Sequence, residues 1–366
     1  MDQYIGLDVS DKETVACVVA KGRKDVYATL PTEVAALRRF VQQQRGKGDR
    51  LHVTFEVSGQ AGWLYDGLSE VADEVAVSNP SKMTWIYRTA KKTDRIDARK
   101  QAVLYQMGEL PRVHMPNRAV RQWRVEIQHR RKLIAQACQI KNRIRAYLKN
   151  EGQVRPAERM GWWTQKCRRW METVLPGDMP LADLLEGLAL LEKQIKRATG
   201  RLNERLQDTP ACVLMTAPGV GPRTAEAVLA YTDEVARFAR GKQYCAYFGV
   251  TPKLDESGGT RRVGHISKQG PSVVRWLIVE SAWRAISKSD ALAKFYLRVQ
   301  HGQAGRKKIA IVAVARKLLS IMRAMLITGE VFNEKLVLQQ EQWPGRRRWR
   351  RRGVAFKFAG PKAGNI

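Results

Sequence analysis

The order of apolar patterns in the first part of the chain is the feature that most limits its fold. Short runs of alternating or continuous apolar residues between turn-like segments predict strands, and apolar residues at three- and four-residue steps predict helices. In chain order these are the strands YIGLDVS, TVACVVA and DVYATL, the helix TEVAALRRFVQQQ with Thr32 as its cap, the strand LHVTFEVSG, the helix GQAGWLYDGLSEVAD, the strand EVAVSNP and the helix DRIDARKQAVLYQMG. The tight connections between the first three strands predict an antiparallel meander.

Three strands, helix, strand, helix, strand, helix is the order of a ribonuclease-H-like fold, and we expect residues 1–112 to form such a mixed α/β domain. Residues 113–208 hold two long helical patterns, the second with leucines at heptad spacing, and predict an antiparallel coiled-coil pair that also serves oligomerisation. Between the two helices, GWWTQKCRRWMETVLPGDMP is expected to be irregular. Residues 209–332 predict a helical domain with a loop-rich stretch, and 333–366 a basic tail that is disordered until it meets nucleic acid.

The charge of the chain indicates its partners. Its 65 Lys and Arg against 35 Asp and Glu give a formal net charge of +30, which favours polyanions and DNA or RNA first. Neither a signal peptide nor an uninterrupted apolar span is visible, so we expect no membrane partner and a cytoplasmic, nucleoid-associated protein of a prokaryote. The five cysteines are scattered without a C-x-x-C pair, which excludes the usual zinc ribbons. The five histidines are equally dispersed, so a metal, if one is bound, must be held by carboxylates.

Four acids are candidates for such a site. Asp8 and Glu56 occupy polar positions of two predicted strands, and Asp94 and Asp97 are three residues apart on one helix face. In a ribonuclease-H-like fold the first strand, the fourth strand and the last helix meet at one edge, where the four carboxylates can hold two Mg²⁺ ions. The alternative for Asp94 and Asp97 is a solvated helix face that is charge-paired with the surrounding lysines and arginines.

Two glycine-rich segments in the third region are also candidates. Gly219 and Gly221 lie in a helix-hairpin-helix-like turn that can approach a phosphate, or in an ordinary helix packing element. Ser257 precedes two glycines and then Arg261 and Arg262. A serine in such a loop is usually a turn former, and as a nucleophile it needs an activating group.

A family resemblance connects these segments. YIGLDVS, FEVSG, NPSK and KTDRIDARK resemble the N-terminal signature of the DEDD transposases of insertion sequences, the bridge-RNA-guided recombinases that include Piv-type DNA invertases. PGVG, FGVTP, ESGG, GHISKQG and VVR resemble the C-terminal transposase domain of the same family. The resemblance implies a RuvC-like domain whose acids are those four carboxylates. It further implies that Ser257 forms a covalent phosphoserine link to DNA, and that acids and serine meet from different subunits.

The expected partners follow from charge and resemblance together. They are donor and target DNA, a structured guide RNA that supplies sequence choice by pairing, and further copies of the chain in a dimer or tetramer. The residues expected to contact nucleic acid are Lys91, Lys92, Gly219, Gly221, Arg261, Arg262, Lys268 and Arg275. Lys268 and Arg275 fit basic positions of the family motif and can neutralise a phosphate.

Three functions compete on this basis. The first is a site-specific DNA recombinase or transposase that uses Ser257 and an Mg²⁺-dependent acid cluster. The second is a RuvC-like, metal-dependent, structure-specific DNA endonuclease in which the acids activate water and Ser257 is inert. The third is a non-catalytic nucleic-acid-binding protein with a decayed site, against which the presence of all four acids argues.

Overall fold

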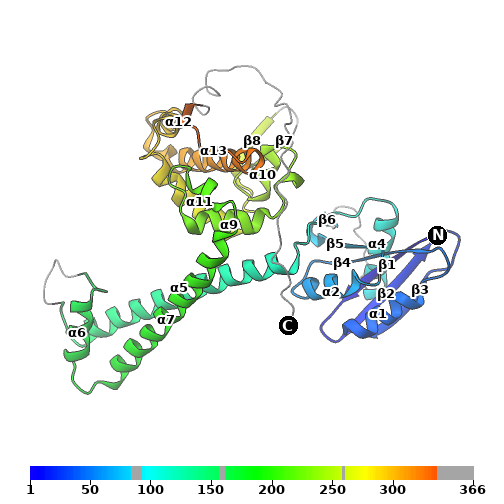
Figure 1. Cartoon of the computed structure of the whole chain (residues 1–366), viewed down its shortest axis with the longest axis horizontal. Coiled ribbons are helices and arrows are strands. Elements are labelled where there is room, and N and C mark those ends of the chain that lie inside the picture. Colours follow the sequence, from blue (N-terminus) through cyan, green and yellow to red (C-terminus); the bar gives the residue numbers. More distant parts are fainter. Residues whose placement is uncertain (84–92, 156–160, 258–259, 336–366) are drawn as a thin grey trace. The chain divides into compact units, whose positions relative to one another are not determined.

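The computed structural model describes residues 1–83, 93–155, 161–257 and 260–335, without the side chains of residues 83, 254–257 and 260–263. The chain divides into two compact units, residues 1–121 and 122–366, and each unit is described by itself. Figure 1 shows the elements of both.

The first unit contains a mixed six-stranded sheet with the spatial order β3-β2-β1-β4-β5-β6. The first three strands pair antiparallel, as the tight connections predict, whereas β4 pairs parallel with β1 and with β5. The strands are β1 Asp2–Val9, β2 Glu13–Ala20, β3 Val26–Pro31, β4 Arg50–Glu56, β5 Glu74–Ser78 and β6 Arg112–Val113. The predicted order of elements is confirmed from β1 through the helix that follows β5, with the four-residue helix α3 Pro80–Met83 added before it.

Helices cover both faces of this sheet (Figure 1). On one face, α1 Val34–Gln43 and α2 Ala61–Leu68 share a core with the alternate residues of β1 and β4 that include Leu7 and Phe55, both fully buried. On the other face, α4 Asp94–Gln106 packs through Ala98 and Ala102. The sheet therefore buries both sides, while alternation sends successive side chains to different helices.

The N-cap predicted for α1 is wrong by one residue. The cap is Glu33, with an extended backbone, and its side chain makes no capping hydrogen bond. The hydroxyl of Thr32 is instead hydrogen-bonded to that of Thr14 across the sheet edge, at 2.8 Å. A side chain already engaged with β2 cannot cap the helix, which sequence spacing alone does not reveal.

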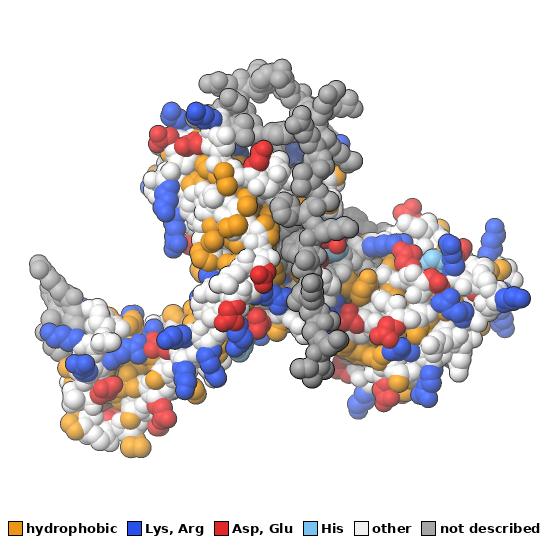
Figure 2. Space-filling model, viewed as in Figure 1, with side chains coloured by type: hydrophobic (Ala, Val, Ile, Leu, Met, Phe, Trp, Pro, Cys, Tyr) orange, Lys and Arg blue, Asp and Glu red, His pale blue; other side chains and the backbone are white. Residues whose placement is uncertain are grey.

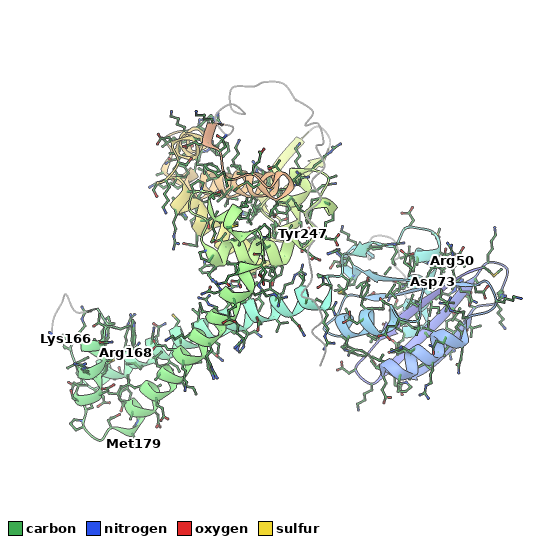
Figure 3. All side chains as sticks on the ribbon, viewed as in Figure 1. Arg50, Asp73, Lys166, Arg168, Met179 and Tyr247 are labelled. Atoms are coloured by element: carbon green, nitrogen blue, oxygen red, sulfur yellow. The ribbon has the colours of Figure 1, made fainter. Side chains whose placement is uncertain are left out.

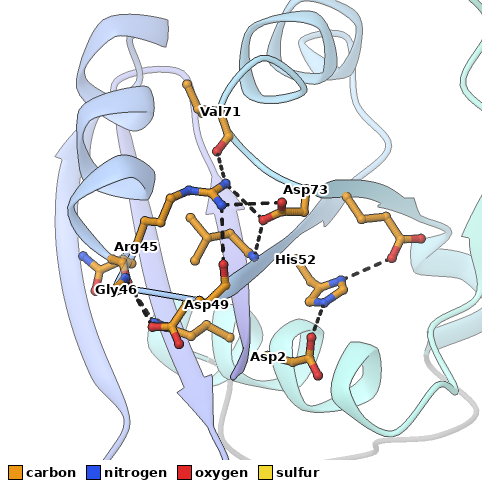
Figure 4. Close-up of polar contacts among 12 residues, drawn as sticks. Asp2, Arg45, Gly46, Asp49, His52, Val71 and Asp73 are labelled. Atoms are coloured by element: carbon orange, nitrogen blue, oxygen red, sulfur yellow. Dashed lines mark hydrogen bonds and ion pairs between the residues drawn. The ribbon is translucent and has the colours of Figure 1, made fainter.

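Ion pairs fasten the end of the sheet at which β1 and β4 begin (Figure 4). Arg45 pairs with Asp73 at 3.0 Å, and the Leu51 amide donates to the same carboxylate at 2.7 Å. That backbone hydrogen bond is the main reason why the pKa of Asp73 lies below its usual range. His52 lies 3.2 Å from Glu74 on the neighbouring strand. These contacts fix the register of β4 and β5 at their amino ends, opposite the candidate acids.

Two long antiparallel helices lead the second unit, α5 Arg118–Asn150 and α7 Met179–Gln207 (Figure 1). The start of α5 shares a core with the end of α7, through Trp123 and Leu202, and its end shares another with the start of α7, through Leu148 and Leu181. Asp178 caps α7, because its carboxylate accepts a hydrogen bond from the Leu181 amide at 2.8 Å. Trp123 is thus a core residue, and its buried ring is not available for stacking on an unpaired base of a nucleic acid.

The connector between the long helices is not irregular, as the sequence predicted, but contains α6 Gln165–Thr173. Thr164 caps this helix by accepting a hydrogen bond from the Cys167 amide at 3.4 Å. Cys167 and Met171, four residues apart, are buried on one face, and an exposed run of basic residues on the other face obscured the pattern.

The remainder of the second unit is a bundle of helices with one hairpin. Its helices are α8 Ala211–Met215, α9 Pro222–Thr232, α10 Gly241–Tyr247, α11 Ser272–Ala285, α12 Asp290–Gln300 and α13 Lys307–Thr328, with short 3-10 turns η1 Val235–Arg237 and η2 Ala304–Arg306. The stretch expected to be loop-rich forms the antiparallel hairpin β7 Pro252–Ser257 and β8 Thr260–Ile266, and α12 was not predicted. Within the described residues, no helix is both long and apolar enough to span a membrane. The predicted disorder of the basic tail concerns residues that, from 336 onward, lie outside the described part.

Candidate active site

The register of β1 and β4 brings the first two acids together. The strands are parallel, with Leu7 opposite Phe55, so Asp8 and Glu56 occupy the next position on neighbouring strands, which lie about 4.8 Å apart. Because Leu7 and Phe55 point into the core under α1 and α2, alternation places Asp8 and Glu56 on the face that α4 covers. Both acids are half-buried at the carboxyl end of the sheet.

Helix α4 contacts this face closely enough to exclude a side chain. A Cβ atom added to Gly6 would lie 2.0 Å from the carbonyl oxygen of Ala98 and 2.7 Å from the amide nitrogen of Ala102. The close approach of helix to strand therefore requires glycine at this position. Gly6 precedes Asp8 by two residues on the same face, so this contact also sets the height of α4 above the acids.

A buried glutamine fixes the position of α4 along the strands. The side-chain amide of Gln101 donates to the carbonyl oxygen of Leu7 at 3.3 Å, and the Ser78 hydroxyl donates to Gln101 at 3.4 Å. Ser78 is the strand partner of Glu56. Gln101 thus connects α4 with β1 and β5 directly beside the two acids, a role that the sequence analysis missed. Its signal was a polar residue one turn after Asp97 on the same helix face.

Asp97 and Asp94 lie on the same face of α4 as Gln101, on the side toward Asp8 and Glu56. Tyr105, near the other end of α4, stacks edge-on against Tyr4 near the start of β1, so α4 runs antiparallel to that strand. Asp97, one turn before Gln101, consequently lies beyond Leu7 in the direction of Asp8. The carboxylate of Asp97 pairs with the ammonium group of Lys100 at 3.1 Å. Asp94 is exposed in the first turn, where the helix dipole favours a carboxylate.

The carboxylates are the ligand type that a divalent cation prefers, although they do not form a complete ligand set by themselves. In the described part of the chain, no three Asp, Glu, His or Cys side chains make a group that could hold a metal ion. Mg²⁺ needs less than that, because it keeps several waters and is usually bound by one or two carboxylates together with substrate phosphates. Asp8 and Glu56 on adjacent strands supply such a pair, and Asp97 approaches the same edge from α4.

Ser257 is the last residue of β7. It pairs in register with Thr260, the first residue of β8. The side chains of Ser257, Arg261 and Arg262 lie outside the described residues, as do Lys91 and Lys92 altogether.

Arg275 and Lys268 lie near the base of this hairpin. The Nη1 group of Arg275 donates to the carbonyl oxygens of Gly270 at 2.9 Å and of Gln269, and burial lowers its pKa. Nη1 of Arg275 therefore stabilises the turn before α11. The other two guanidinium nitrogens of Arg275 make no hydrogen bond within the described residues. Lys268 is exposed, with a left-handed backbone (φ 55°).

The two glycines of the helix-hairpin-helix-like turn differ in their surroundings. Gly219 has a φ of 75°, and an added Cβ would lie 2.3 Å from the carbonyl oxygen of Ser281 on α11. Its backbone is thus packed against protein. Gly221 is the N-cap of α9, and nothing lies within 4 Å of an added Cβ. Of the two, Gly221 is the one that leaves room for an anion at the start of a helix.

Two family profiles match separate parts of the chain. A family profile described as Transposase, of the DEDD and IS110 type, matches residues 5–151, and the profile Transposase IS116/IS110/IS902 family matches residues 211–297. A probable family 20 transposase of Pseudomonas aeruginosa is 26% identical over 75% of this chain and 83% of its own length. The pilin gene-inverting protein of Moraxella bovis is 22% identical over 91% of this chain and 98% of its own.

The fold, the acids at one sheet edge and these similarities define an enzyme that acts on DNA as a transposase or recombinase. Both matched profiles carry the name of the IS110 group of insertion sequences. The chain belongs to the IS110 family of DEDD transposases.

Proposed function

We propose that this protein is a site-specific recombinase of an insertion sequence that cuts and rejoins DNA through a covalent phosphoserine intermediate. The sheet order and the helices on its two faces support a ribonuclease-H-like, RuvC-like first domain. The observation that carries the proposal is the placement of Asp8 and Glu56 side by side, with the acidic first turn of α4 on the same face.

The acids have a defined task in this proposal. Asp8, Glu56, Asp94 and Asp97 hold divalent metal, with Mg²⁺ the expected ion. When bound, such an ion neutralises phosphate oxygens and positions the phosphodiester. Gln101 keeps α4 in place beside Asp8, and Gly6 allows it to approach. A structured guide RNA selects the DNA sites by pairing, and the α5–α7 pair acts as a coiled coil that joins subunits.

The covalent step is a transesterification. The Ser257 hydroxyl oxygen attacks the phosphorus of a DNA phosphodiester, a new O–P bond forms, and one bond between phosphorus and a deoxyribose oxygen breaks. The serine proton ends on the released sugar hydroxyl, so neither water nor an energy source is consumed. Attack by a different sugar hydroxyl reverses the step and rejoins the strands. Arg261, Arg262 and Lys268 are proposed to neutralise the phosphate.

A nicked suicide DNA substrate tests this proposal. When the short strand beyond the cleavage point dissociates, the protein remains attached and migrates as an adduct on denaturing gels. We expect Ser257→Ala to abolish the adduct and Asp8→Asn to lower its yield at least 100-fold, with wild-type DNA binding in both. Free DNA ends without an adduct, unchanged in Ser257→Ala, would show a metal-dependent endonuclease instead.

A further inference from the structure

Two adjacent tryptophans lie at the end of the α5–α7 helical pair that carries α6. Trp162 and Trp163 are half-buried between α5 and α6, with ring centroids 6.5 Å apart and planes inclined by 37°. They are packed against a small core that includes Cys167 and Met171. Figure 3 labels Lys166 and Arg168 of α6 in the same place. Since both rings are only half-buried, the core uses part of their surface.

Three cationic groups lie over the two rings. The Lys141 ammonium is 5.1 Å from the Trp163 centroid, and the Arg145 guanidinium is 5.4 and 5.5 Å from the Trp163 and Trp162 centroids. Arg155 lies 5.6 Å from the Trp162 ring. Arg145 is exposed and forms no ion pair with any described residue, so its only partners there are the two rings.

The surroundings of the rings are strongly basic. Between residues 141 and 172, the described residues include eight Lys or Arg and only two acids. Glu192 of α7 pairs with two of these cations, Lys141 at 3.2 Å and Arg168 at 2.7 Å, and leaves the others in excess. The basic residues are Lys141, Arg143, Arg145, Lys149, Arg155, Lys166, Arg168 and Arg169. Figure 2 shows Lys and Arg side chains gathered along this arm of the second unit. A ring pair within such a field offers stacking surface and phosphate contacts together.

We propose that Trp162 and Trp163, with Arg145 and Lys141, form a binding platform for a single-stranded nucleic acid segment. An unpaired base stacks on the indole surface in place of the Arg145 guanidinium, and the displaced guanidinium moves to the adjoining phosphate. The exchange is favourable because a base stacked on an aromatic ring binds more strongly than a solvent-exposed cation does. A duplex cannot use the platform, because its bases are already stacked on one another.

Trp170, on α6, shows how the same residue type is used without this arrangement. Its half-buried ring joins the same small core, and no cation lies over it within the described residues. Likewise, Arg143 is exposed, as Arg145 is, and lies two residues away on α5, but it contacts no ring of the described residues. Trp170 and Arg143 therefore provide matched controls for a stacking and a charge contribution. The platform goes beyond the proposed function, since it needs neither Ser257 nor metal.

Photo-crosslinking of the full chain locates the contact. Twelve-nucleotide RNA and DNA strands carrying 5-iodouracil are irradiated with the Ser257→Ala protein in EDTA, and tryptic peptides are identified by mass spectrometry. Both tryptophans fall in the peptide MGWWTQK, residues 160–166, while Trp170 falls in the peptide that starts at residue 170. We expect adducts on MGWWTQK from a single strand of RNA or DNA and none from the same strand in a duplex. Adducts confined to other peptides overturn the proposal.

Affinity measurements with substituted proteins provide the second readout. Trp162→Leu/Trp163→Leu retains apolar packing, and its binding of a labelled single strand is expected to fall at least tenfold, with duplex binding unchanged. Trp170→Leu is expected to stay within twofold of wild type. For single-strand binding, Arg145→Gln should reduce the magnitude of the negative slope of log K against log salt concentration by about 0.7. Arg143→Gln should leave this slope unchanged. Equal losses on single strand and duplex, or equal effects of the two arginine changes, overturn the proposal.

Discussion

Replacement of Gly6 by alanine tests whether the contact between β1 and α4 holds the acids together. The added Cβ would lie 2.0 Å from the Ala98 carbonyl oxygen, whereas an ordinary contact begins at 3.4 Å. Since the clash is with helix backbone and not with a flexible side chain, α4 must move by at least 1.0 Å (3.0 − 2.0) along that direction, and by 1.4 Å (3.4 − 2.0) to restore an ordinary contact. Overpacking of this kind destabilises by about 1–3 kcal/mol.

The displacement has a second consequence at Gln101. Its hydrogen bond to the Leu7 carbonyl is 3.3 Å long, so a shift of that size in α4 breaks it. The loss adds about 0.5–1.5 kcal/mol. We therefore expect Gly6→Ala to lower the free energy of unfolding by about 2–4 kcal/mol. Because Asp97 moves with α4, strand cleavage should fall about 100-fold, as displacements of about 1 Å do in other active sites.

Urea unfolding and the adduct assay measure the two effects in the same preparation. Gly59→Ala is the matched control: it lies in the same unit, its backbone is not left-handed, and nothing lies within 4 Å of its added Cβ. It should change the free energy of unfolding by less than about 0.5 kcal/mol. A Gly6→Ala protein as stable and as active as Gly59→Ala would refute the reasoning, since α4 could then not be in contact with β1 at this position.

Three further predictions concern other parts of the chain. Burial raises the pKa of Glu226 to about 7 despite its ion pair with Arg223 on α9. The folded state therefore keeps a proton that the unfolded state releases above about pH 4.5. As the pH rises from 5 to 8, wild type should lose about 2–3 kcal/mol of stability relative to Glu226→Gln, as urea unfolding can measure. Gly219→Ala should destabilise by more than about 2 kcal/mol, because of its positive φ and the α11 backbone, whereas Gly221→Ala should be nearly neutral in the same assay. Burial raises the pKa of Cys17 to about 11, so native protein at pH 8 should be alkylated at exposed Cys138 and not at Cys17, as peptide mass spectrometry can show.

Patterns with a clear period predicted most of the first unit. Alternating runs located β1 to β5, and the tight connections gave the antiparallel pairing of the first three. The adjacency of Asp8 and Glu56 followed from the expected fold and agrees with the parallel register of β1 and β4. Which side chain a strand sends to which helix could also be predicted, since alternation fixes it once one face is apolar.

What the sequence did not reveal depends on contacts between distant segments. In the sequence, Gly6 is an ordinary position on the polar face of a strand, and its contact with α4 has no local signal. The hydrogen bond from Gln101 to the Leu7 carbonyl has none either. In α6, basic residues hid a helix of which only one face is apolar. The hairpin of β7 and β8 was not predicted, because glycines and charged residues outweighed the strand signal of its short strands.

Lys100 offsets part of the negative charge of the candidate acids. Its ammonium group pairs with Asp97 at 3.1 Å, at the edge where the register also places Asp8 and Glu56. Asp8 and Glu56 on adjacent strands repel each other, and Lys100 supplies one of the positive charges that offset the negative charge at this end of the sheet. If Asp97 held a divalent ion, Lys100 would have to leave it or the ion would have to take the other oxygen of that carboxylate. Since both side chains are partly exposed, the pair contributes only about 0.2–1 kcal/mol, little against the affinity of carboxylates for a doubly charged ion.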